Sequence, residues 1–149
     1  MSFDWEAYKK LAEQLVLFTE TPSLNLGDLD KEAALRSAIS RAYYCIYHTT
    51  TIYLKDYTEY DPKKYEAYQQ LIDAYSNSIY RERRALAAKI DRLRRRRVRA
   101  DYWQDFEEKT RGKPDFGLNI TAVAKQTLNE AGNIITAIQQ LQIRPGKLI

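Results

Sequence analysis

The chain has 149 residues, and its small number of breakers, 5 Gly and 4 Pro, favours one globular domain over residues 1–149. One cysteine, Cys45, excludes an internal disulfide framework, and one histidine, His48, excludes a multi-histidine metal site within one chain. The mean hydropathy is −0.60, and no run approaches the roughly 20 apolar residues that a membrane helix needs. The N-terminus has no basic leader before an apolar stretch. We therefore expect no signal peptide and a soluble cytoplasmic protein without a metal or cofactor.

The formal net charge of +4 is distributed unevenly along the chain. Residues 81–99 contain nine Arg and one Lys against two acidic residues, so this segment has a net charge of +8 and the rest has −4. Such asymmetry favours an anionic partner, with nucleic acid as the first candidate. The alternative is a solvated helix face that pairs with acidic residues elsewhere, and the charge alone leaves both interpretations open.

Helical patterns account for the first part of the chain. Apolar residues at spacings of three and four predict a first helix over residues 4–19, with Asp4 as its N-cap. The Thr-Pro pair that ends at Pro22 stops this helix, and residues 22–27 are expected to form a loop. A long helix is expected over about residues 30–56.

Helical patterns also dominate the second part. Pro62 predicts the start of a third helix, because proline is favoured at the first helical position, and the Ser-Asn-Ser around Asn77 interrupts it. Further helices are expected over about residues 79–102 and 119–141, separated by the longest loop, and a short tail begins at Arg144. No segment alternates with period two over a strand's length. The sequence therefore predicts an all-α fold of about five helices in an up-down bundle.

The long helix over residues 30–56 has two stripes of special interest. Its apolar stripe consists of Leu35, Ile39, Ala42, Ile46 and Tyr53. A second stripe, about 130° away, consists of Ala34, Ser37, Arg41, Tyr44, Cys45, His48 and Ile52. The second stripe is also largely apolar, yet it contains a cation and an imidazole. This pattern predicts a helix that is covered on two sides, either at the centre of a bundle or at a subunit interface.

Arg41 and His48 are seven residues apart, so their side chains lie about 20° apart around the helix and roughly 10.5 Å apart along it. Both can reach one phosphodiester, and two copies across a dimer can form one composite cleft. A cation and an imidazole suffice for metal-independent RNA cleavage. The imidazole moves a proton to or from the 2′-hydroxyl or the leaving oxygen, and the guanidinium stabilises charge on the phosphate. The alternative is a pair of hydrogen-bonded core residues.

Two segments carry a resemblance to a known family. Leu35-Arg-Ser-Ala-Ile-Ser-Arg-Ala-Tyr-Tyr-Cys-Ile-Tyr-His48 resembles the HEPN family, in its branch with a Ser-Arg-Ala-Tyr-Tyr-x-x-Phe/Tyr-His helix. Arg97-Val-Arg-Ala-Asp-Tyr102 resembles the second motif of that branch, Arg-x-x-Ala-Asp-Tyr. The resemblance covers about residues 5–141. Ala42 and Thr50 depart from the polar residue and the tyrosine that some active members carry at these positions.

The resemblance implies a compact helical bundle that dimerises through the face with Arg41 and His48. Many HEPN proteins are metal-independent ribonucleases of toxin–antitoxin, phage-defence and CRISPR systems, with an arginine, four to six residues, and a histidine. Other members bind a nucleotidyltransferase-type protein or a nucleotide without cleaving RNA. On this basis Arg41 and His48 are the expected catalytic residues, with Ser37 and Tyr44 as neighbours of the active site.

Residues outside this pair have structural and functional interpretations. The arginines expected to contact RNA backbone are Arg94, Arg95, Arg96 and Arg99, and the alternative for them is a solvated arginine-rich surface. Arg97, Asp101 and Tyr102 are expected to be structural, with an ion pair between the first two at i,i+4. Tyr44 could stack a base or fill a helix interface, and Cys45 is expected to be a small buried residue.

Two hypotheses from different classes follow. The first is a homodimeric, metal-independent endoribonuclease, a toxin or phage-defence effector that leaves 2′,3′-cyclic phosphate ends, with a nucleotidyltransferase-type antitoxin as a candidate partner. The second is a non-catalytic helical module that binds a nucleotidyltransferase-type protein or a nucleotide. Cleavage of RNA in the absence of metal, lost on His48→Ala, separates the two.

Overall fold

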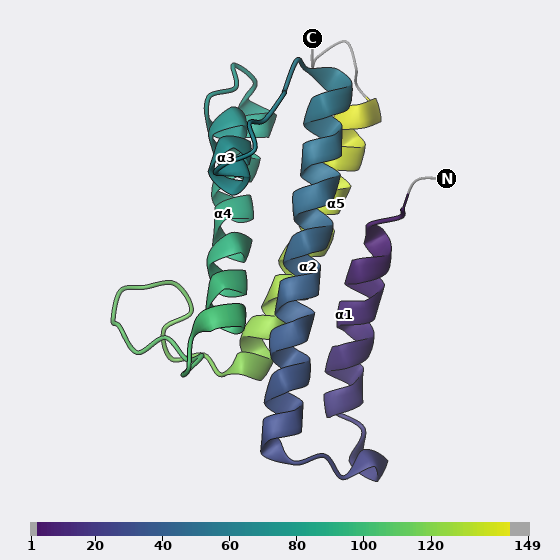
Figure 1. Cartoon of the computed structure of the whole chain (residues 1–149), viewed down its shortest axis with the longest axis vertical. Helices are drawn as coiled ribbons and strands as arrows, with labels where there is room; N and C mark the ends of the chain where they lie inside the picture. Colours follow the sequence, from purple (N-terminus) through teal and green to yellow (C-terminus); the bar gives the residue numbers. More distant parts are fainter. Residues whose placement is uncertain (1–2, 144–149) are drawn as a thin grey trace.

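A computed structural model of the chain describes residues 3–143. Within this range the fold is helical and contains no strand, as the sequence predicts (Figure 1). The elements are α1 (Glu6–Thr19), the short 3₁₀ helix η1 (Pro22–Leu24), α2 (Asp28–Tyr57), α3 (Ala67–Ser76), α4 (Arg81–Tyr102) and α5 (Ile120–Ile143). None of these helices is sufficiently long and apolar to cross a lipid bilayer.

Four of the five helices have bounds close to those predicted. The ends of α1, α2, α4 and α5 all lie within two residues of the predicted bounds. α1 begins at Glu6 and its N-cap is Trp5 rather than the expected Asp4, whose Oδ1 accepts a hydrogen bond of 3.0 Å from the backbone N–H of Glu6. The predicted tail from Arg144 lies outside the described residues.

The start of α3 differs from the prediction. α3 begins at Ala67 rather than near Pro62, and the preceding Glu66 has a left-handed backbone with φ of 56°. The side chain of Gln70 explains the non-helical approach, because its amide bonds to the backbone of that segment. Its Oε1 accepts from the N–H of Lys63 at 2.8 Å, and its Nε2 donates to the carbonyl of Tyr65 at 2.5 Å.

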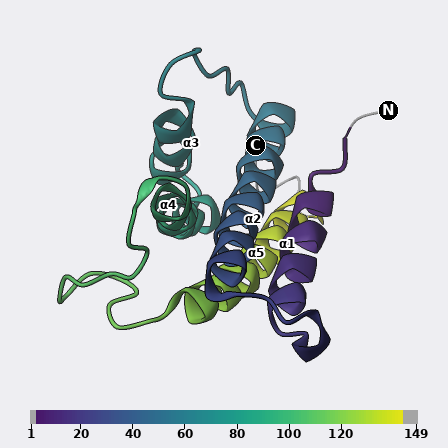
Figure 2. The ribbon, with the colours of Figure 1, turned by 60° about the horizontal axis from the view of Figure 1, so that its bottom comes forward.

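α2 is the central helix of the bundle. In Figures 1 and 2 it lies between α1 and α4, with α5 behind it, and it packs against all three. Every member of its predicted apolar stripe is buried. The second stripe is covered only in part. Cys45 is buried, whereas Arg41 and Ile52 are exposed and His48 is half-buried. One face of α2 is therefore left open between α1 and α4.

Candidate functional site

The open face of α2 presents the predicted catalytic pair together. Ser37, Arg41, Tyr44 and His48 recur at spacings of three and four, so they follow one another along one face of the helix. Ser37 and Arg41 are exposed, and Tyr44 and His48 are half-buried. The face lies between α1 on one side and α4 on the other (Figure 1). We call it the α2 face below.

The N-cap residue and the first turn of α1 contact His48 and Arg41. The indole of Trp5 stacks on the imidazole of His48, with a centroid distance of 3.5 Å and an interplanar angle of 12°. One turn later, the ring of Tyr8 lies 5.1 Å from the guanidinium carbon of Arg41. The two aromatic rings also contact each other, at 5.4 Å. Two aromatic side chains three residues apart, at the N-cap and in the first turn of α1, thus contact two polar side chains seven residues apart on α2.

His48 is placed by ring contacts and not by hydrogen bonds. Tyr47 lies edge-on to the imidazole at 5.1 Å, and neither imidazole nitrogen makes a hydrogen bond with the described residues. Burial lowers the pKa of His48 below its usual range, and the positive charge of Lys55 lowers it further. The neutral imidazole therefore predominates at neutral pH, which is the form that accepts a proton.

Arg41 is an exposed cation without an acidic partner. It forms no ion pair with any residue in the described part of the chain, and its guanidinium is in contact with the Tyr8 ring instead. A cation–π contact leaves the N–H donors at the edge of the guanidinium plane available. These donors can form a forked pair with a phosphate, which a guanidinium bound to a carboxylate can do less readily.

The two sequence motifs meet across the interface between α2 and α4. Arg97 Nε forms the predicted ion pair with Asp101 at 2.9 Å, and its NH2 group donates to the Tyr44 hydroxyl at 2.6 Å. The Ser40 hydroxyl donates to the same carboxylate of Asp101 at 3.3 Å. The guanidinium of Arg97 also lies 5.5 Å from the ring of Tyr102. Tyr44 is thereby fixed at the edge of the α2 face.

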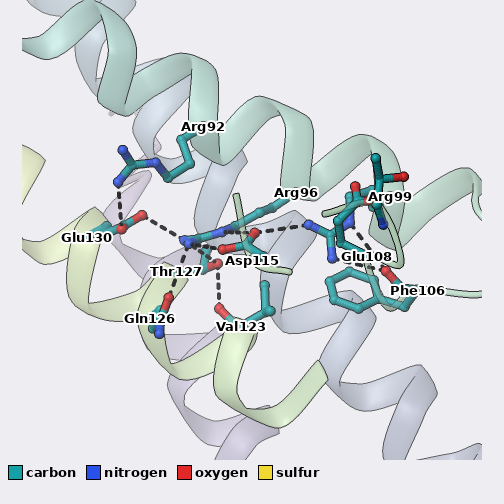
Figure 3. Close-up of polar contacts among 11 residues, drawn as sticks. Arg92, Arg96, Arg99, Phe106, Glu108, Asp115, Val123, Gln126, Thr127 and Glu130 are labelled. Carbon is teal, nitrogen blue, oxygen red and sulfur yellow. Dashed lines mark hydrogen bonds and ion pairs between the residues drawn. The ribbon is translucent and has the colours of Figure 1, made fainter. Parts of the chain in front are cut away.

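Two of the four arginines expected to contact RNA are placed differently. Arg96 and Arg99 are buried, with exposed fractions of 2% and 6%, and both bind the carboxylate of Asp115 (Figure 3). Arg96 donates to this carboxylate from Nε at 2.9 Å and from NH2 at 2.8 Å. Arg99 also donates to the carbonyl of Phe106. Their donors point into the protein, so the structure corrects the expectation that they contact an external backbone.

The network around Arg96 is extended by α5. Its NH1 group donates to Glu130 at 2.7 Å and to Thr127 at 3.3 Å, so one guanidinium joins α4, α5 and the segment before α5. Burial raises the pKa of Asp115, but hydrogen bonds and positive charge from Arg96 and Arg99 outweigh this effect and lower the pKa overall. The carboxylate is therefore ionised at neutral pH.

The other two arginines remain accessible. Arg95 has 66% of its side chain exposed and Arg94 has 31%, and both pair with Asp91, at 2.9 Å and 3.5 Å.

Cys45 is buried as expected, and burial raises the pKa of its thiol. Within residues 3–143, no group of three or more His, Cys, Asp or Glu side chains could bind a metal ion.

Comparison with family models, with curated proteins and with solved structures gives no match to this chain.

Sequence reasoning missed several residues that contact the site. Trp5 and Tyr8 lie on the apolar stripe predicted for the first helix, but that pattern does not indicate which residue of another helix they meet. Asp115 lies in the predicted loop, where no periodicity marks it as a buried partner. Arg36 belongs to the first motif and lies next to the α2 face, and its position in the sequence does not indicate its contact with the end of α4.

Proposed function

We propose that this protein is a metal-independent endoribonuclease of the HEPN type, a toxin or phage-defence effector that acts as a homodimer through the α2 face. One observation supports this proposal most directly. Arg41 and His48 lie together on an open helix face, each is oriented by an aromatic ring, and neither engages its nitrogen atoms with the described residues. A cation and an imidazole oriented in this way suit a ligand phosphate.

The proposed reaction is a transesterification within the RNA. The neutral imidazole of His48 takes the proton of a 2′-hydroxyl, the 2′-oxygen forms a bond to the adjacent phosphorus, and the bond from phosphorus to the 5′-oxygen breaks. The products are a 2′,3′-cyclic phosphate and a 5′-hydroxyl. The 5′-oxygen receives its proton from an imidazolium or from water, and a second copy of the chain supplies the second imidazole. The guanidinium of Arg41 stabilises the extra negative charge on the phosphate.

The test is RNA cleavage by the purified protein in EDTA, with analysis of the product ends. We expect the wild type to leave 2′,3′-cyclic phosphate, and we expect His48→Ala and Arg41→Ala each to lose at least about 100-fold in rate, which is typical for removal of an acid–base or charge-stabilising group. The matched control is Arg81→Gln, which removes an exposed arginine at the start of α4. Equal cleavage by wild type and His48→Ala would contradict the proposal.

A second candidate is the non-catalytic helical module that binds a nucleotidyltransferase-type protein or a nucleotide. The observation that favours it is the stacking of Trp5 on His48, because the indole covers one face of the only imidazole in the chain. This candidate predicts no cleavage by the wild type in EDTA, together with a stable complex with the partner protein or nucleotide that depends on the α2 face.

A further inference from the structure

We propose that the groove between α4 and the segment 103–118 binds the phosphodiester backbone of single-stranded RNA. The identity of the ligand as RNA rests on the function proposed above, whereas the site itself is separate from Arg41 and His48. The groove has a volume of about 590 Å³. One wall is the outer face of α4, with Arg94, Arg95 and Arg92, the last of which pairs with Glu130 of α5 at 3.1 Å, and the other wall includes Lys113.

The groove has an excess of positive charge. Asp91 is the only carboxylate paired with Arg94 and Arg95 in the described part of the chain, so one negative charge faces two positive ones. Lys113 is exposed and forms no ion pair with a described residue. Glu108 also lines the groove, and its Oε1 accepts a hydrogen bond from the backbone N–H of Thr110. A concave surface with surplus cations attracts a polyanion.

The second wall of the groove is rigidly attached to the bundle. Asp115 lies two residues after Lys113, and its buried carboxylate bonds to both Arg96 and Arg99. The backbone around Lys113 is closed by a turn in which its N–H donates to the carbonyl of Thr110 at 3.3 Å. The backbone that carries Lys113 is therefore fixed relative to α4 before any ligand binds, which reduces the entropy lost on binding.

An aromatic side chain in the groove favours nucleic acid over an acidic peptide. Trp103 follows the last residue of α4, lines the groove and is 42% exposed. An exposed indole beside cations can stack an unpaired base while the arginines contact phosphate, and stacking of this kind is tolerant of sequence. An acidic peptide offers the same charge but no bases to stack.

The groove opens away from the α2 face. Arg95 and Arg97 differ by about 200° around the α4 axis, and Arg97 contacts Tyr44 on α2, so Arg95 points to the opposite side of α4. Substitutions of Arg95 therefore leave the surroundings of Arg41 and His48 unchanged. This separation allows RNA binding in the groove to be measured independently of cleavage.

The test is a binding measurement with fluorescein-labelled single-stranded RNA of about 12 nucleotides, a length within the site sizes of known single-strand binders. The parent protein is the full chain with His48→Ala, which prevents the proposed cleavage. The groove variant adds Arg95→Gln and Lys113→Gln, and the control adds Arg81→Gln and Lys89→Gln. All four positions are exposed, the charge change is the same, and Arg81 and Lys89 do not line the groove.

We expect the groove variant to bind at least about tenfold more weakly than the control near 0.1 M salt. Its plot of log affinity against log salt concentration should be shallower by about 1.4, since each lost contact to a single strand removes about 0.7. Equal affinities and equal slopes for groove and control variants would overturn the inference.

Two further binding measurements identify the ligand. Trp103→Leu should weaken RNA binding by about tenfold, as expected for the loss of one stacked base. A labelled polyglutamate of similar charge should bind much more weakly than the RNA, and binding as tight as the RNA would overturn the inference in favour of an acidic protein partner. If the wild type cleaves no RNA but the groove variant still loses affinity, the proposed function fails while the groove inference stands.

Discussion

At the scale of single residues, the surroundings of His48 are unusual for the acid–base group that we propose it to be. A histidine in a catalytic role is commonly oriented through a hydrogen bond to one nitrogen, which also sets the tautomer. Here the Trp5 indole restrains the plane of the ring and excludes water from one face, while both nitrogens are left without a partner among the described residues. Either nitrogen can consequently take the proton, depending on how the substrate approaches.

This arrangement makes the pKa of His48 dependent on Trp5. Replacing the indole in Trp5→Leu exposes the imidazole, and because burial is the main cause of the lowered pKa, we expect the pKa to rise toward its usual value of about 6.5. The measurement is a ¹H NMR titration, in which the only histidine of the chain gives an unambiguous signal. Trp103→Leu, which changes the other tryptophan, should leave the pKa unchanged. A pKa that is unaltered or lower in Trp5→Leu would contradict this role.

At the scale of elements, the end of α4 is stabilised by a side chain from α2. The NH1 group of Arg36 donates to the carbonyls of Ala100 and Trp103 at 3.1 Å and 2.7 Å, and its NH2 group donates to that of Gln104 at 3.0 Å. These carbonyls include ones that have no partner within the helix, and a cation at this end also complements the helix dipole. Arg36 therefore connects the first sequence motif to the end of the second.

We expect Arg36→Met to lower the free energy of unfolding by about 2 kcal/mol, because a charged donor is removed from the partly buried carbonyl of Ala100 and from the exposed carbonyls of Trp103 and Gln104. Urea denaturation followed by circular dichroism measures the change. The control is Arg81→Met at the exposed start of α4, for which we expect less than about 0.5 kcal/mol. Similar losses in the two variants would show that Arg36 has no special role at the end of α4.

The helices themselves could be predicted because their pattern is local. Apolar spacing defines α1, α2, α4 and α5, whereas the start of α3 was misplaced because the Gln70 side chain bonds to the chain seven residues earlier. The α2 face was also predictable, since it depends on the spacing within one helix. The burial of Arg96 and Arg99 could not be predicted in this way. Their partner Asp115 is 19 and 16 residues away in a loop, and nothing in the local pattern marks that contact.

At the scale of the whole molecule, Asp115 joins the segment before α5 to α4. Its carboxylate is shared by two buried guanidinium groups, so its loss leaves both without their common counter-charge. We expect Asp115→Asn to cost about 3–5 kcal/mol of unfolding free energy in urea denaturation, the range for breaking a buried ion pair. Asp105→Asn is the control, because its pair with Lys109 is largely exposed and should contribute almost nothing. Equal stabilities of the two variants would contradict this role of Asp115.

The association of two copies is the property on which the proposed catalysis depends. In a two-fold dimer the same patch of each subunit meets itself, and the α2 face is the patch that carries the proposed catalytic pair. Ser37 is exposed on that face, one turn before Arg41, and its side chain makes no hydrogen bond with the described residues. A glutamate at this position is compatible with the helix, since Glu and Arg at i,i+4 form a favourable pair, but it introduces a buried charge into the proposed interface.

We therefore expect Ser37→Glu to fold normally and to convert the protein from twice the chain mass of 17.5 kDa to a monomer, as measured by sedimentation equilibrium. The control is Thr136→Glu, which places the same charge on an exposed position of α5 and should leave the dimer intact. If the cleft requires both copies, the monomeric variant also loses RNA cleavage in EDTA, both because the second copy is missing and because the new carboxylate can pair with Arg41. A monomeric Ser37→Glu protein that cleaves RNA as fast as the wild type would instead show that one chain contains the complete site, and that the proton for the 5′-oxygen comes from water.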